Sequence, residues 1–159
     1  MNIFVLHTNT KLAAQMHCDK HVVKMITETA QLLSTTISLC GGTGPYKVTH
    51  KNHPCARWAR ECTENWEWLK LLGLELYDEY KFRYDNKTHK AGEIITQMEA
   101  PHLKANGEKT PFVQCMPDEF KHSSPVVAYR QYYLGAKKDL LNYKLRGAPQ
   151  WVTTGNVYV

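Results

Sequence analysis

The side chains best suited to moving protons and holding phosphate recur at helical spacing near the amino-terminal end of the chain. Residues three or four positions apart are neighbours on one face of a helix, and this face carries His17, His21, Lys24, Glu28 and Gln31, with Lys20 beside it. Imidazoles and carboxylates can act as acid and base. We therefore predict catalytic roles for His17, His21 and Glu28. We predict that Lys20 and Lys24 bind phosphate; the alternative is a solvated polar face with one Lys24–Glu28 pair.

A basic loop that leads directly into a second predicted helix is another candidate phosphate site. Free backbone N–H groups at a helix amino terminus attract anions. The candidate phosphate- or nucleotide-binding residues of this region are Tyr46, Lys47, His50, Lys51, His53 and, in the helix that follows, Arg57. The alternative is a basic surface loop in which Asn52 or His53 caps the helix.

Near the carboxyl end, aromatic and basic residues alternate in a predicted helix. Aromatic rings stack on bases and guanidinium groups bind phosphates, so we predict that Tyr129 and Arg130 contact a nucleotide. The alternative places Tyr129 and Tyr133 in the core, because they are four residues apart, and leaves Arg130 solvated.

The histidines and cysteines match no established metal-binding pattern. His17 and His21 form a two-ligand helical pair, and His50, His53 and Cys55 give three donors close in sequence. Zinc sites use such ligands, but at other spacings, so we predict no metal and no cofactor. The five cysteines are odd in number and contain no Cys-x-x-Cys pair, which indicates free thiols.

Hydrophobic periodicity predicts an all-α protein. Apolar residues at helical spacing predict helices over residues 11–38, 54–80, 88–98 and 123–144. Residues 2–7 are either a short strand or an extended lead-in, and residues 101–122 form a long ordered loop. Asn65 interrupts the second apolar stripe, so its amide either orients a neighbouring helix or points into a pocket. We expect one helical domain over residues 1–159, with three main helices, a short helix and long loops.

Length and charge agree with a small globular domain that binds an anion. The chain has 159 residues, a net charge of +5, 8 His and 9 Tyr, which permits a nucleic-acid or nucleotide partner. No apolar run approaches the ~18 residues of a membrane span, and the start does not resemble a signal peptide. We expect an intracellular protein that does not enter membranes and is compatible with a homo-oligomer.

Several segments resemble a group of small proteins encoded by tailed phages and large DNA viruses. They are residues 1–7, 17–25, 46–54, 116–119 and 128–133. More distantly, residues 1–80 resemble the pyrimidine-dimer DNA glycosylases typified by endonuclease V of T-even phages. The shared pattern is a Leu-His lead, a first helix with basic and acidic residues on one face, and a Tyr-x-x-x-His-x-x-His-Pro loop into the next helix.

This resemblance implies an all-α fold of three main helices and cleavage of the bond between a damaged pyrimidine and its sugar. In the family, the amine of the residue at position 2 attacks and a first-helix glutamate assists. Here position 2 is Asn2, a side chain large enough to favour retention of Met1, so no position-2 amine would be free. The acidic helper aligns near His21 in one register and near Glu28 in another.

Two functions follow from these patterns. The first is a viral protein that recognises a nucleotide or nucleic acid and hydrolyses a glycosidic or phosphodiester bond, as a DNA glycosylase, nuclease or nucleotide phosphodiesterase does. The alternative is a non-catalytic sponge that sequesters a cyclic-nucleotide or other nucleotide immune signal of the host. Either would act in the cytoplasm of an infected cell.

Overall fold

The computed structural model describes residues 1–159 and contains helices and no strand. The α-helices are α1 (Thr10–Met16), α2 (Asp19–Leu39), α3 (Pro54–Ala59), α4 (Thr63–Arg83), α5 (Lys90–Gln97), α6 (Pro125–Ala136) and α7 (Gln150–Thr154). Two short 3₁₀ turns, η1 (Asp118–Phe120) and η2 (Lys138–Leu140), complete the chain. The predicted all-α class and single domain are confirmed. No helix is both long and apolar enough to cross a bilayer.

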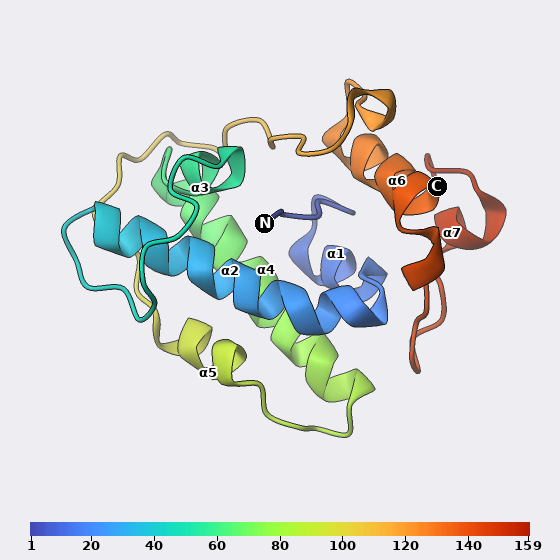
Figure 1. Cartoon of the computed structure of the whole chain (residues 1–159), viewed down its shortest axis with the longest axis horizontal. Coiled ribbons are helices and arrows are strands. Elements are labelled where there is room, and N and C mark those ends of the chain that lie inside the picture. Colours follow the sequence, from blue (N-terminus) through green and yellow to red (C-terminus); the bar gives the residue numbers. More distant parts are fainter.

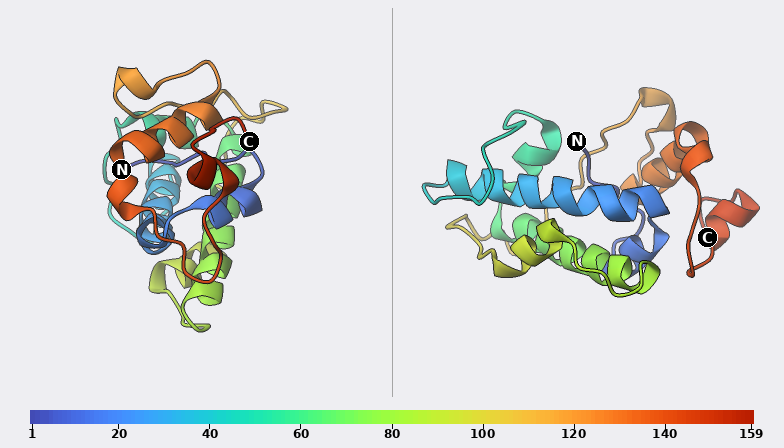
Figure 2. Two further views of the ribbon diagram at one scale, coloured as in Figure 1. Left: turned by 90° about the vertical axis from the view of Figure 1, so that its right-hand side faces the viewer. Right: turned by 60° about the horizontal axis from the view of Figure 1, so that its bottom comes forward.

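The two long helices α2 and α4 pack along each other and form the centre of the fold (Figure 1). The predicted stripe of α2, which includes Val22, Ile26 and Leu33, is fully buried between them. Helix α5 packs against both α2 and α4, and α1 packs against α4. Figure 2 shows α6 and α7 gathered at one end of it.

The first predicted helix is broken into α1 and α2, which corrects the expected continuous helix over residues 11–38. His17 and Cys18 have extended backbones between the two helices. The buried guanidinium of Arg83 donates to the carbonyl oxygens of Gln15 (2.9 Å) and His17 (2.8 Å). These bonds satisfy carbonyl groups that a continuous helix would have bonded internally, so α4 stabilises the break.

The second predicted helix is also broken, into α3 and α4, at Cys62. The backbone N–H of Thr63 donates to the carbonyl oxygen of Lys104 at 3.0 Å, which fixes the long loop against the start of α4. Asn65 is fully buried, and its amide donates to the Trp58 carbonyl (2.8 Å) and the Thr110 hydroxyl (2.7 Å). Asn65 therefore orients α3, which confirms one of its two predicted roles.

The segment before α1 is an extended lead-in and not a strand. Its residues Ile3–Leu6 are buried, and it runs along α2 in the opposite direction. The Met1 amine lies beside Glu28, while the Phe4 ring stacks on His21 with 4.4 Å between centroids. Three extended residues cover ~10 Å and seven helical residues cover a similar ~10 Å. The lead-in thus matches the helix face that it covers.

Candidate active site

The amine of Met1 and the carboxylate of Glu28 form an ion pair on the outer side of α2. Their N···Oε1 distance is 3.1 Å, and the Lys24 ammonium lies 3.8 Å from the other carboxylate oxygen. The side chains of Met1 and Glu28 are only 4% and 12% exposed, whereas that of Lys24 is 69% exposed. Figure 1 places the amino terminus over α2, between α3 and α6. An amine and a carboxylate in this geometry can act as nucleophile and proton acceptor.

Asn2 anchors the residue that carries this amine. Its side chain donates to the Cys115 carbonyl oxygen at 2.9 Å, and its Oδ1 accepts the Ile3 N–H at 2.8 Å. The hydroxyl of Tyr129 lies 3.0 Å from the same Oδ1. In this structure the amine next to Glu28 is that of Met1, and the nitrogen of Asn2 belongs to the peptide bond that follows Met1.

An imidazole and two thiols gather beside the amine. One ligand atom from each of His53, Cys55 and Cys115 lies within 4.8 Å of the others, and the two Sγ atoms are 3.5 Å apart. We call Met1, Asn2, Glu28 and this trio the amino-terminal site. The positive charge of the Met1 amine acts to lower the pKa of each of the three donors.

Burial, hydrogen bonding and nearby charges shift the pKa values of the two thiols in opposite directions and lower the pKa of His53. Burial and the Met1 amine lower the pKa of His53. A hydrogen bond with Cys55 lowers the pKa of the Cys115 thiol to about 7, and the Lys121 ammonium acts in the same direction. The same hydrogen bond and burial raise the pKa of Cys55. Cys115 is thus the more acidic thiol.

His17 and His21 lie in the core, which corrects their expected placement on one open helix face. His17 ends α1 and donates from Nδ1 to the Ala13 carbonyl oxygen at 2.7 Å. His21 shares a 2.6 Å hydrogen bond with the Tyr133 hydroxyl and is covered by Phe4. Burial lowers the pKa of His17 to about 4 and that of His21 to about 3. Neither ring reaches a solvent-borne substrate without opening the core.

Tyr129 and Arg130 are also buried, which corrects their expected position as nucleotide contacts. The Tyr129 hydroxyl donates to the Val113 carbonyl oxygen at 2.7 Å, as its alternative core placement requires. Arg130 is not solvated in the way that alternative expects. Its guanidinium donates to the carbonyl oxygens of Leu6 (3.0 Å) and Val157 (2.9 Å), so it joins the lead-in to the carboxyl end of the chain.

The basic loop before α3 packs against the second half of α2. The Ser34 hydroxyl donates to the carbonyl oxygen of the half-buried Tyr46 at 3.2 Å. His53 caps α3 by accepting the Cys55 N–H at 3.1 Å, which decides between the two predicted caps. The remaining predicted phosphate-binding residues are all exposed: Lys20, Lys47, His50, Lys51 and Arg57. Of the basic residues predicted to bind phosphate, Lys24 is the one whose side chain lies within 4 Å of Glu28.

The family model for pyrimidine dimer DNA glycosylases matches residues 1–91. This is more than half of the chain. The chain belongs to the pyrimidine dimer DNA glycosylase family. Searches of curated proteins and of solved structures found no match. Family membership indicates DNA-glycosylase-like function and nucleic-acid binding.

The match covers most of the residues of the amino-terminal site. Met1, Glu28, His53 and Cys55 lie inside the matched residues, whereas Cys115 lies beyond them. The ion pair with Met1 selects Glu28 over His21 as the acidic residue beside the amine. Sequence reasoning missed Asn2 and Cys115 as parts of the site. Only the three-dimensional fold brings Asn2 and Cys115 to Cys55, and no spacing signal marks Asn2 or Cys115.

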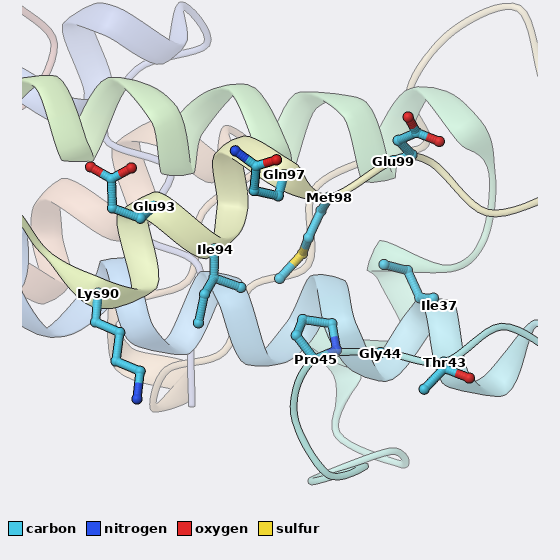
Figure 3. Close-up of a pocket in the computed structure, with 10 residues that line it drawn as sticks. All are labelled: Ile37, Thr43, Gly44, Pro45, Lys90, Glu93, Ile94, Gln97, Met98 and Glu99. Atoms are coloured by element: carbon cyan, nitrogen blue, oxygen red, sulfur yellow. The ribbon is translucent and has the colours of Figure 1, made fainter.

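Two of the surface hollows can be compared with the position of the amino-terminal site. One, of about 810 Å³, lies between α5 and the loop after α2, where Figure 3 shows Ile94 and Met98 extending toward the segment that carries Pro45. None of its lining residues belongs to the amino-terminal site. The other, of about 680 Å³, is open and is lined by residues on either side of Cys115, among them Val113, Gln114 and Lys121. None of the residues that line this second hollow belongs to the amino-terminal site either, although Gln114 directly precedes Cys115 in the chain.

Proposed function

We propose that the protein is a DNA glycosylase in which the Met1 amine attacks the sugar of a damaged pyrimidine nucleotide and Glu28 is its proton-transfer partner. The observation that carries the proposal is the 3.1 Å contact between these two groups, in a chain of the pyrimidine dimer DNA glycosylase family. The amine is free when Met1 is the first residue of the mature chain, which an intact-mass measurement tests.

The reaction needs an unprotonated amine and a group that stabilises positive charge on the sugar. Glu28 can accept a proton from the amine as the nitrogen forms a bond to C1′ of the nucleotide. The bond from C1′ to the base breaks, and its electron pair leaves with the base, which takes up a proton. The ring oxygen then leaves C1′ as a hydroxyl group and an imine joins Met1 to the sugar. A carboxylate nearby also stabilises positive charge that develops on the sugar.

The surface around Met1 can hold a nucleic-acid strand. Enzymes that cut a base from duplex DNA extrude the target nucleotide and bind the flanking phosphates. Lysine and arginine side chains are exposed on α2, on the loop after it and on α3: Lys20, Lys24, Lys47, Lys51 and Arg57. Their exposure, and the 3.8 Å distance between Lys24 and Glu28, support the predicted role of these residues in phosphate binding.

The test compares cleavage of the base–sugar bond with the amine free and with the amine moved. The cut base stays joined to its neighbour through the dimer, so base release is measured as the free thymine that appears when light reverses the dimer after the reaction. The substrate is a duplex with one thymine dimer, and an undamaged duplex is the blank. A Gly-Ser extension before Met1 moves the free amine ~7 Å along the chain, so we expect release to fall to the blank level. The control variant carries the same extension after Val159 and keeps full activity. Equal release by both variants contradicts the amine as nucleophile.

The sponge alternative predicts a different result in the same assay. A sponge binds a small nucleotide, returns it intact and releases no base from damaged duplex. No contact in the amino-terminal site favours that alternative. The viral origin and the location in the host cytoplasm stay predictions.

A further inference from the structure

The trio of His53, Cys55 and Cys115 has the composition of a zinc site. Zinc binds thiolates at ~2.3 Å and imidazole nitrogen at ~2.0 Å in tetrahedral geometry, which places two bound sulfurs ~3.8 Å apart. The two Sγ atoms are 3.5 Å apart, and all three donor atoms lie within 4.8 Å of one another. Small side-chain shifts are enough to place one ion among them.

We propose that His53, Cys55 and Cys115 bind one Zn²⁺ ion beside the amino terminus. Two thiolates and an imidazole form a soft donor set, which favours zinc over magnesium or calcium. No carboxylate belongs to the trio. Three protein donors leave one position of a tetrahedral ion open.

The fold already holds the backbone of each donor. Cys55 is fully buried in the first turn of α3, directly after Pro54. The carbonyl of Cys115 accepts the Asn2 amide and its N–H donates to the Tyr129 hydroxyl at 3.2 Å. A site whose donors are fixed before the ion arrives loses little conformational freedom on binding.

His53 links metal binding to the start of α3. Its Nδ1 accepts the Cys55 N–H at 3.1 Å. If Nδ1 binds the ion, its lone pair is used; if Nε2 binds, Nδ1 carries the proton. In both cases the capping bond is exchanged for a metal bond, so zinc binding is expected to alter the amide signal of Cys55.

The ion would join two parts of the chain that border Asn2. Cys55 lies in α3 and Cys115 in the long loop, 60 residues apart in sequence. The Sγ of Cys55 lies 3.7 Å from Asn2 Oδ1, and the Cys115 carbonyl bonds the other end of the same amide. Zinc would thereby fasten both walls of the pocket that holds residue 2, next to the Met1 amine.

Metal content tests this proposal without any assay of DNA cleavage. Reduced protein is stripped with a chelator, loaded with Zn²⁺ or Co²⁺ and washed. We expect one metal ion per chain and, with Co²⁺, the absorption of a cobalt–thiolate bond. Cys115→Ser should weaken Co²⁺ binding at least ~10²-fold, since loss of even an outer-shell partner costs 10- to 100-fold. Cys40→Ser, which changes an exposed cysteine outside the trio, is the matched control.

Three outcomes overturn the proposal: substoichiometric metal in wild-type protein, Cys115→Ser protein that binds as much metal as wild type, or a Cys55–Cys115 disulfide that persists in reductant without metal. Thermal unfolding of Cys115→Ser protein without metal shows whether that variant is folded. Because no DNA is present, failure here leaves the proposed glycosylase activity untouched, and loss of base release leaves the metal result untouched.

Discussion

His21 and Glu28 are seven residues apart on α2, close to two full turns, so they lie on the same side of the helix. Phe4 covers His21, whose ring is bonded to Tyr133 and lies in the core. Glu28 lies under the very end of the chain and pairs with the Met1 amine. One lead-in therefore gives two neighbouring polar residues different environments.

The segment that packs on α2 therefore divides the polar face of this helix into a covered part and a part with charged groups. Where the lead-in continues, the face is closed and its histidines are neutral core residues. Where the lead-in ends, a largely covered charged pair lies next to an exposed lysine, Lys24. The amino-terminal site and the buried histidine pair, His17 and His21, should thus respond differently to mutation and to pH.

The largest expected effect is the loss of base release in Glu28→Gln. The amide keeps the size of the side chain but cannot accept a proton, and such losses cost about 10²- to 10⁴-fold in rate. Single-turnover base release measures the effect, and circular dichroism checks the fold. Glu67→Gln, at an exposed carboxylate of α4 without an ion pair, should match wild type. Equal rates for both variants would remove Glu28 from the chemistry.

Phe4→Ala should destabilise the packing of the lead-in on α2, where Phe4 covers His21. Phe4 is 5% exposed and stacks on His21, and removal of a buried phenylalanine side chain costs about 3–5 kcal/mol of unfolding free energy. Urea denaturation measures the loss. Phe82→Ala is the control because Phe82 is 47% exposed, and we expect it to cost no more than ~1 kcal/mol. Similar losses in the two variants would show that the lead-in is not packed on α2.

Acidification should destabilise the fold through the buried histidine pair. The folded-state pKa values of about 4 for His17 and about 3 for His21 lie below the ordinary value of 6.5. The unfolded chain therefore binds more protons, and stability falls as the pH drops below about 6.5. Between pH 7 and pH 5 each ring accounts for about 2 kcal/mol. In urea denaturation the decrease should be about 2 kcal/mol smaller in His21→Gln than in wild type; an unchanged decrease would contradict the burial of His21.

Lys24→Ala should have the smallest effect. Lys24 is 69% exposed on its side chain and lies 3.8 Å from Glu28, so its expected role is one phosphate contact. Loss of one such contact should weaken duplex binding for damaged and undamaged DNA alike. It should also reduce the slope of log K against log[salt] by about one. Lys87→Ala, in the exposed loop between α4 and α5, is the control. A loss confined to damaged DNA would instead give Lys24 a role in recognition.

Local patterns predicted the helices well where one helix has one apolar stripe. Val22, Ile26 and Leu33 are buried as expected, and Pro54 and Pro125 begin α3 and α6. The two breaks were not predictable from spacing, because the groups that stabilise them, Arg83 and Lys104, are far away in sequence. The five-residue helix α7 was missed for the same reason, since the buried Trp151 holds it against distant parts of the chain.

The candidate site was only partly predictable. Glu28 stood out from its helical spacing, but the sequence could not choose between Glu28 and His21 as the acidic helper. That choice depends on how far the lead-in reaches along α2, which is a tertiary property. Cys115 had no signal at all, since its partners Cys55 and Asn2 approach it only after the long loop has folded back.

The most direct test of the central claim is to trap the imine and locate it. Wild-type protein is incubated with thymine-dimer duplex and sodium borohydride, and the covalent adduct is digested and mapped by mass spectrometry. We predict a reduced sugar adduct on the Met1 amine, absent from undamaged duplex and strongly reduced in Glu28→Gln. Base release without any adduct, or an adduct on a lysine side chain, would contradict the Met1 amine as the nucleophile.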